Sequence, residues 1–168
     1  MTAAALLLLL VTLQRLGELF HARRNTRRLL AEGAVEIGAG HYPLLVLLHA
    51  SWLGALWIRI VSGHAEFIWP AAALYLVVEC ARVWVMASLG RYWTTRILVP
   101  RAAPLVRCGP YRFLRHPNYW VVAAEIALLP LALGSWPIAV VFSLANAAML
   151  AWRIRIEEAT MAPRRGLA

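Results

Sequence analysis

Residues 109–134 read GPYRFLRHPNYWVVAAEIALLPLALG, and in this stretch a polar, turn-prone segment passes directly into a long apolar run. The initial Gly-Pro marks a turn, and Pro117 suits the first position of a helix, where its missing N–H would be unpaired in any case. We therefore predict a helix that begins at His116-Pro117. Its free N–H groups and positive dipole end would favour an anionic or zwitterionic small molecule near Arg115 and Tyr119. The alternative is a capped, positively charged loop at a membrane edge.

Apolar runs of similar character recur along the rest of the chain. The chain has 168 residues, of which 62% are hydrophobic, and roughly 20 apolar residues at ~1.5 Å each cross a ~30 Å hydrocarbon layer. We predict an all-α, polytopic membrane bundle with one domain over residues 1–168. Residues 1–89 would supply the N-terminal transmembrane helices, and residues 90–168 a polar loop, a helical hairpin and a short tail. Five segments approach the length of a span: about residues 2–20, 42–61, 67–89, 117–134 and 137–152.

The arginines between these runs act as topology signals. The connections near residues 62–66 and 134–136 contain no arginine. By the positive-inside rule, the N-terminus is predicted to lie outside, and residues 90–116 and the C-terminal tail in the cytoplasm. The arginines that define this pattern are Arg23, Arg24, Arg27 and Arg28 after the first run, six within residues 91–115, and Arg153, Arg155, Arg164 and Arg165 after the fifth.

The N-terminal run is expected to be a retained helix. A cleaved signal peptide is the competing account, but no basic residue precedes Leu6 and no convincing small-x-small cleavage site follows Val11. All basic residues are arginine and all acidic residues are glutamate, a composition that we associate with GC-rich bacterial genomes. The expected location is therefore a bacterial inner membrane.

Other classes of protein fit the sequence poorly. The net charge of +9 could indicate a nucleic-acid partner, but the arginines lie between apolar runs rather than on a soluble face. Cys80 falls within a predicted span and Cys108 in a predicted cytoplasmic loop, so we expect neither a disulfide nor a zinc site. No metal ligand set is assigned.

Ionisable residues at membrane depth need partners or a function. Glu79 and Arg82 are three residues apart on one predicted helical face, and we expect a local ion pair. Glu125 has no basic residue nearby in its own helix and lies two turns after Asn118. Its carboxylate should therefore face a cavity or a partner helix, and a functional role is open.

A second polar cluster ends the fifth run. Asn146, Arg153 and Glu157 follow one another at spacings of seven and four, with Arg155 and Glu158 beside them. Short-range Arg-Glu contacts, worth only a few tenths of a kcal/mol on an exposed helix, are the simplest explanation. If the last two runs form a hairpin, however, the glutamates return to the start of the preceding helix. The two motifs together would suit a ligand that bears both a carboxylate and cationic groups.

These motifs resemble the isoprenylcysteine carboxyl methyltransferase family of membrane enzymes. The matching pieces are Gly-Pro-Tyr at residues 109–111, Arg-His-Pro-Asn-Tyr at 115–119 and Glu-Glu at 157–158. The similarity covers roughly residues 85–160 and is closest to small bacterial members associated with O-methylation of alkylresorcinols and alkylpyrones. The stretch Gly-Arg-Tyr-Trp-Thr-Thr-Arg at residues 90–96 belongs to it.

The resemblance implies an S-adenosylmethionine site that faces the cytoplasm, within residues 90–168, and a lipophilic acceptor that enters from the bilayer. Trp93, Arg96 and Asn146 are added as candidate acceptor contacts because of their position and polarity. Glu125, His116 and Arg153 are the candidate catalytic residues. The residues implied as cofactor contacts are Tyr111, Arg115, His116, Pro117, Tyr119, Glu157 and Glu158.

The acceptor class determines which residues the reaction needs. The methyl donor is already activated, so the protein mainly supplies orientation and a water-poor site, worth up to ~7–11 kcal/mol. A phenolic or enolic acceptor, such as an alkylresorcinol or alkylpyrone, must lose a proton, and Glu125 or His116 could accept it. An isoprenylcysteine-like carboxylate needs no base, but a cation such as Arg96 or Arg153 would hold it.

Two further interpretations remain open. Membrane sterol and steroid reductases have a similar C-terminal pattern, so an NADPH-dependent reductase is an alternative, although no G-x-G-x-x-G loop is present. A non-catalytic membrane scaffold is another, because resemblance in fold does not establish activity. Larger family members carry a further segment after the glutamate pair, where this sequence has residues 159–168. Formation of a homo-oligomer could supply the missing cover.

Overall fold

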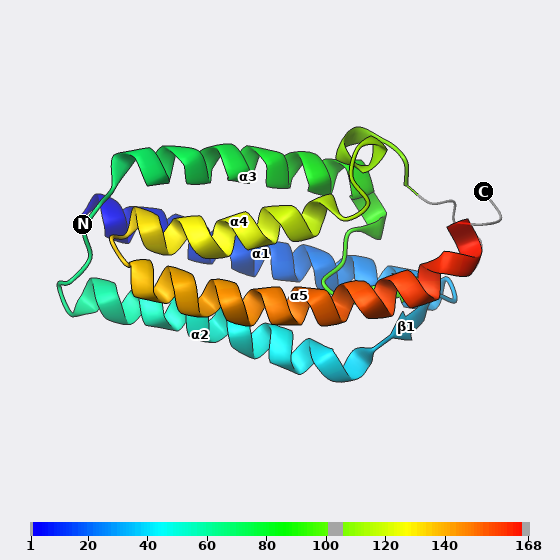
Figure 1. Ribbon diagram of the computed structural model, residues 1–168. Helices are drawn as coiled ribbons and strands as arrows, with labels where there is room; N and C mark the ends of the chain where they lie inside the picture. The colour runs from blue at the N-terminus through cyan, green and yellow to red at the C-terminus, as the bar shows by residue number, and fades with distance from the viewer. Residues whose placement is uncertain (1, 101–105, 166–168) are drawn as a thin grey trace.

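The computed structural model describes residues 2–100 and 106–165, with side chains described up to residue 160. Five helices run side by side in this part of the chain, and each runs antiparallel to the one before it in the sequence (Figure 1). The all-α membrane bundle predicted from the sequence is confirmed, whereas its orientation in the membrane stays a prediction. The helices are α1 (Ala3–Ala31), α2 (Tyr42–Val61), α3 (Trp69–Leu89), α4 (Pro117–Ala132) and α5 (Trp136–Arg165).

The helices differ in length. By length and composition, α1, α2, α3 and α5 can each cross a membrane. In contrast, α4 has 16 residues, or about 24 Å at ~1.5 Å per residue. α1 has 29 residues, extending past the predicted end at residue 20, because its basic continuation consists largely of good helix formers. Gly33, with φ 85°, follows the end of α1.

Both α4 and α5 begin near the predicted points. His116 is the N-cap of α4 and Pro117 its first residue, as the sequence predicts. α5 packs antiparallel to α4 and continues well beyond the predicted end at residue 152, so that it carries Glu157 and Glu158 past the start of α4. Of the arginines used to predict topology, Arg101 and the side chains of Arg164 and Arg165 lie outside the described residues.

A short antiparallel β-pair, which the sequence analysis did not predict, ties the two connections at one end of the bundle together. It joins β1 (Val35–Ile37) to β2 (Ile97–Val99), with Val35 opposite Val99 and Ile37 opposite Ile97. Three 3₁₀ turns lie in the same connections: η1 (Ala39–His41), η2 (Gly90–Tyr92) and η3 (Gly109–Arg112). The pair therefore fixes the α1–α2 connection against the α3–α4 connection.

A network of charged residues lies inside the largely apolar bundle. Two arginines and three glutamates from α1, α3 and α4 meet there: Arg15, Glu18, Glu79, Arg82 and Glu125. Arg15 Nη2 lies 2.7 Å from Glu79 Oε1 and 3.0 Å from Glu125 Oε1. Arg82 Nη1 donates to Glu125 Oε2 at 2.9 Å, and Arg82 Nε donates to Glu18 Oε1 at 2.6 Å.

This network corrects one expectation and confirms another. The expected local pair of Glu79 with Arg82 is wrong, because both side chains bind residues of α1 and Arg82 also binds α4. Glu125 does face partner helices, as its isolation in the sequence indicated. The charges therefore connect three helices, in keeping with the rule that intramembrane charges are paired inside a bundle.

Candidate functional site

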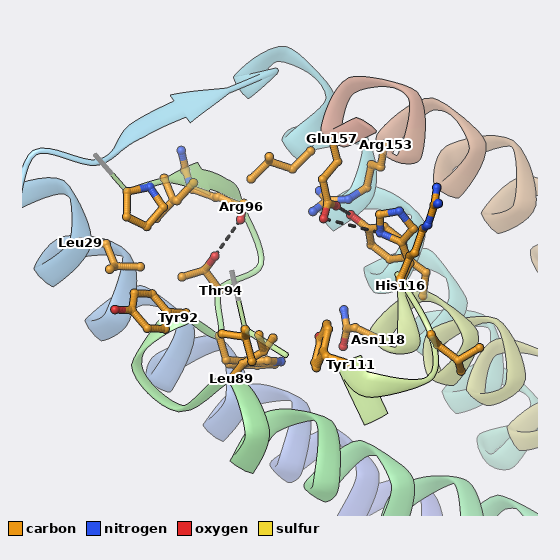
Figure 2. A pocket seen from close by; sticks show the side chains of 18 of the residues that line it. Leu29, Leu89, Tyr92, Thr94, Arg96, Tyr111, His116, Asn118, Arg153 and Glu157 are labelled. Atoms are coloured by element: carbon orange, nitrogen blue, oxygen red, sulfur yellow. Dashed lines mark hydrogen bonds and ion pairs between the residues drawn. The ribbon is translucent and has the colours of Figure 1, made fainter. Parts of the chain in front are cut away.

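A cavity of about 490 Å³ lies at the end of the bundle that carries the β-pair (Figure 2). This volume falls within the range of ~300–1,000 Å³ that is usual for small-molecule sites. Figure 2 shows His116, Arg153 and Glu157 grouped on one side of the cavity, with Leu29 and Tyr92 on the other. A charged wall thus faces a wall of more apolar character.

The charged wall forms where the start of α4 meets the extension of α5. His116 Nε2 lies 2.7 Å from Glu158 Oε1, and His116 Nδ1 lies 3.5 Å from Glu157 Oε1. Tyr119 Oη donates to Glu157 Oε2 at 2.6 Å. The His116 and Tyr119 rings stack with their centroids 5.4 Å apart. The hairpin therefore brings together the Arg-His-Pro-Asn-Tyr and Glu-Glu motifs, which are about forty residues apart in the sequence.

The pKa values of His116 and Tyr111 are both shifted by their surroundings in this wall. Hydrogen bonding to Glu157 raises the pKa of His116 above its usual value of 6.5; burial opposes this change and Glu158 adds to it. An imidazole with a carboxylate near each nitrogen is favoured in its doubly protonated, charged form. Burial, followed by the charge of Glu157, raises the pKa of Tyr111, so its hydroxyl stays protonated as a hydrogen-bond donor.

Replacing Glu158 with glutamine is expected to lower the pKa of His116 toward 6.5, because one of the two carboxylates that stabilise the imidazolium is lost. Since the folded-state pKa is raised, the stabilisation from this pairing is complete below about pH 6.5 and is lost as pH rises through the folded-state pKa. Histidine NMR titration of wild type and Glu158→Gln measures the change. An unchanged His116 titration would contradict this role of Glu158.

Two arginines in the cavity are held mainly by residues at the connection between α1 and α2. Arg96 Nη1 contacts both carboxylate oxygens of Glu36 at 2.8 Å, and its guanidinium lies 4.4 Å from the centre of the Tyr42 ring. Arg153 Nη1 lies 2.9 Å from His41 Nε2, and Arg153 Nη2 donates to the Thr95 carbonyl at 3.2 Å. The sequence analysis missed Glu36 and His41, because separations of 60 and 112 residues leave no local spacing signal.

Most of the remaining site residues proposed from the sequence also line the cavity. Tyr111, Arg115, Trp93 and Arg96 do so. Pro117 is buried as the first residue of α4, next to the lining residues. Glu158 reaches the cavity through His116 rather than as a lining residue.

Glu125 and Asn146 are not brought into the cavity. Glu125 belongs to the charged network between α1, α3 and α4, and Asn146 is buried on α5 with 1% of its surface exposed. Asn118, in contrast, lines the cavity although the sequence analysis gave it no binding role. Its position within the Arg-His-Pro-Asn-Tyr motif was the available signal.

The Gly-Pro turn fixes the approach of Tyr111 to the cavity. Gly109 has φ 56°, a conformation that residues with a Cβ rarely adopt. A Cβ at this position would collide with Ser88 Oγ and lie 3.2 Å from Trp84 Nε1. The turn can therefore pack closely on the end of α3 only because it contains glycine.

The fold and the site together define a helical membrane protein with a polar ligand cavity at one end of a helical hairpin. The sequence profile of the isoprenylcysteine carboxyl methyltransferase (ICMT) family matches residues 71–163, so the chain belongs to this family of membrane methyltransferases. The match spans most of α3, all of α4 and most of α5, and it leaves out α1, the β1 segment and α2.

Two relatives extend the similarity over most of the chain. The uncharacterized protein YpbQ of Bacillus subtilis is 37% identical over 156 residues, covering 91% of this chain and 93% of that protein. An uncharacterized protein of Haemophilus influenzae is 25% identical over 142 residues, covering 82% and 83%. No solved structure matches the chain.

Proposed function

We propose that this protein transfers a methyl group from S-adenosylmethionine to a lipophilic acceptor. The observation that carries the proposal is the group formed by His116, Tyr119 and Glu157, from the two helices of the hairpin, on the wall of a cavity. The opposite wall includes leucines from α1 and α3. The cavity thus combines polar groups for a charged cofactor with apolar surface for a lipid.

The chemistry of the lining residues fits this cofactor. Glu157 supplies a carboxylate for an ammonium group, while Arg153 and Arg115 supply cations for a carboxylate. Asn118 Oδ1 and Trp93 Nε1 are buried and have no hydrogen-bond partner among the described residues, although both side chains line the cavity. Because unpaired buried polar atoms are costly, a bound ligand that satisfies them is favoured.

The reaction requires little covalent chemistry from the protein. When bound, S-adenosylmethionine supplies a methyl group already activated on a sulfonium. Glu157 and Tyr119 are held by their mutual hydrogen bond and so present a fixed surface for orientation. The rings of Tyr111 and Tyr119 help to exclude water from the cavity that they line.

The acceptor that we favour is a phenolic or enolic polyketide lipid, such as an alkylresorcinol or alkylpyrone. Of the two candidate bases, His116 lies at the cavity and Glu125 is paired with Arg15 and Arg82 away from it. The raised pKa of His116 favours its protonated form, so it can act as a base only after it has lost its own proton, and its neutral form is then the stronger base. An isoprenylcysteine-like carboxylate is the second candidate, favoured by the position of Arg153 on the cavity wall.

We infer that the cavity faces the cytoplasm of a bacterial inner membrane. The supporting observation is the charge distribution, because the arginines of the α1 extension and of the α3–α4 connection gather at the cavity end of the bundle. The opposite connections, between α2 and α3 and between α4 and α5, contain no arginine. A lipid acceptor would then reach the cavity from the cytoplasmic leaflet.

Binding of S-adenosylhomocysteine to the detergent-solubilised protein, measured by calorimetry, tests the proposal. Wild type is expected to bind saturably, and His116→Gln to bind roughly 10- to 150-fold more weakly, because a hydrogen bond to a charged group contributes about 1.5–3 kcal/mol. His64→Gln is the matched control, since His64 is exposed in the α2–α3 connection. A well-folded wild type that binds a nicotinamide cofactor instead would overturn the proposal.

A further inference from the structure

Arg153 is a buried cation whose direct contacts within the described part of the chain are with neutral groups. It exposes 5% of its surface. Its contacts are His41 Nε2, the Thr95 carbonyl and the face of the Tyr119 ring, 5.8 Å from the ring centre. Within residues 2–100 and 106–160, Arg153 has no carboxylate in ion-pair contact. Glu157, four residues further along α5, interacts with Arg153 electrostatically but makes no ion-pair contact with it. Because a buried charge without a counter-charge in contact is unfavourable, this guanidinium is suited to an anion brought by a ligand.

The contact with His41 defines the protonation state of that ring. A guanidinium only donates hydrogen bonds and does not lose its proton in proteins. At 2.9 Å from Arg153 Nη1, His41 Nε2 must therefore be the acceptor. The ring proton then resides on Nδ1 and the ring is neutral. A doubly protonated His41 would set an N–H and a positive charge against the guanidinium.

Burial and close packing hold the ring of His41 against Arg153. It exposes 2% of its surface, and its Nδ1 has no hydrogen-bond partner among the described residues. Gly38, with φ 65°, lies so close that a Cβ there would be 2.9 Å from His41 Nδ1. The Trp152 ring packs 5.8 Å away. The charged groups that face His41 are Arg153 from α5 and Glu36 from β1, and Glu36 is already bound to Arg96.

We propose that His41 is a positioning residue that, as a neutral ring, aims Arg153 at a carboxylate of the bound ligand. Protonation of His41 would break this contact and weaken ligand binding. The inference rests on the proposed function, but it goes beyond the family match, because η1 lies outside residues 71–163. The carboxylate can belong to the cofactor or to the acceptor.

Two variants separate positioning from simple packing. His41→Gln keeps a side-chain oxygen able to accept from Arg153, whereas His41→Leu removes the acceptor and keeps apolar bulk. We expect His41→Leu to bind S-adenosylhomocysteine about tenfold or more weakly, and His41→Gln to stay within roughly threefold of wild type. Wild-type affinity should fall at acid pH more steeply than that of His41→Gln, which has no titrating ring. Circular dichroism checks that each variant is folded.

A comparison with a second ligand shows whether the carboxylate bound by Arg153 belongs to the cofactor or to the acceptor. 5′-Methylthioadenosine lacks the amino-acid part of the cofactor, so its binding should be insensitive to His41→Leu if Arg153 binds the cofactor carboxylate. If S-adenosylhomocysteine binding is also unchanged, the proposal requires a raised KM for a carboxylate-bearing acceptor with kcat preserved. If binding and KM both match wild type in His41→Leu, the proposal is overturned.

A measurement without ligand keeps this inference separate from the proposed function. Nitrogen-15 NMR of histidine-labelled protein should show His41 as the neutral tautomer protonated on Nδ1 at neutral pH. Arg153→Met should relax that preference, because the donor facing Nε2 is lost. A His41 ring charged at neutral pH would refute the positioning role even if the cofactor binds. If the wild type shows this tautomer but binds no S-adenosylhomocysteine, the proposed function is refuted, whereas the contact between His41 and Arg153 is still supported.

Discussion

Arg82→Met is expected to lower the free energy of unfolding by about 3–5 kcal/mol, the usual effect of removing one partner from a buried ion pair. Arg82 contacts Glu18 on α1 and Glu125 on α4, and it is 7% exposed. The substitution leaves three carboxylates in the network with Arg15 as the remaining cation. The decrease in the free energy of unfolding should therefore be larger than that caused by removing a single contact.

Arg91→Met is the matched control for this experiment. Arg91 forms an ion pair with Glu32 at 2.6 Å, but the two side chains are 49% and 42% exposed. Exposed ion pairs contribute about 0–1 kcal/mol, so this variant should unfold close to wild type. Denaturant or thermal unfolding in one detergent compares the three proteins. Equal losses in both variants would show that the internal network does not hold α1, α3 and α4 together.

Glu157→Gln is expected to reduce methyl transfer by roughly 10- to 150-fold, because it removes a charged hydrogen-bond acceptor worth about 1.5–3 kcal/mol from the cavity wall. Glu157 lines the cavity and accepts from Tyr119, whereas Glu158 acts through His116. Glu158→Gln should therefore lose less activity, about tenfold or below. The assay follows labelled methyl from S-adenosylmethionine into an alkylresorcinol in detergent micelles.

The control for the glutamate series is Glu66→Gln. Glu66 is exposed at the opposite end of the bundle, beside Gly134, and lines no part of the cavity. Its substitution should leave methyl transfer unchanged. A larger loss in Glu158→Gln than in Glu157→Gln would reverse the assignment, and would mean that the state of His116 matters more than the carboxylate on the wall.

Local rules account for what the sequence predicted well. The start of α4 at His116-Pro117 follows from the geometry of proline at a helix N-terminus. The return of Glu157 and Glu158 to that point follows from the length of α5 and its antiparallel packing on α4. Both inferences needed only residues near one another in the sequence or one helical hairpin.

Contacts between distant segments account for what the sequence analysis did not find. The pairing of β1 with β2, and through it the Glu36–Arg96 contact, joins segments about 60 residues apart. The partners of Glu125 lie on other helices, so its isolation within α4 could indicate a partner without naming it. One signal was available, since Arg15 lies inside the first predicted span and an intramembrane arginine requires a counter-charge.

The shortness of α4 has a consequence for where the reaction would occur. Trp69 and Trp136, 72% and 69% exposed, begin α3 and α5 at the end opposite the cavity, where aromatic side chains commonly mark a bilayer surface. Measured from that surface, α4 rises only about 24 Å of a ~30 Å hydrocarbon layer. If these tryptophans mark the bilayer surface, the first residues of α4, with His116, would be recessed below the opposite surface. A lipid could present its head group there without extraction from the leaflet, while a water-soluble cofactor would have to descend to meet it.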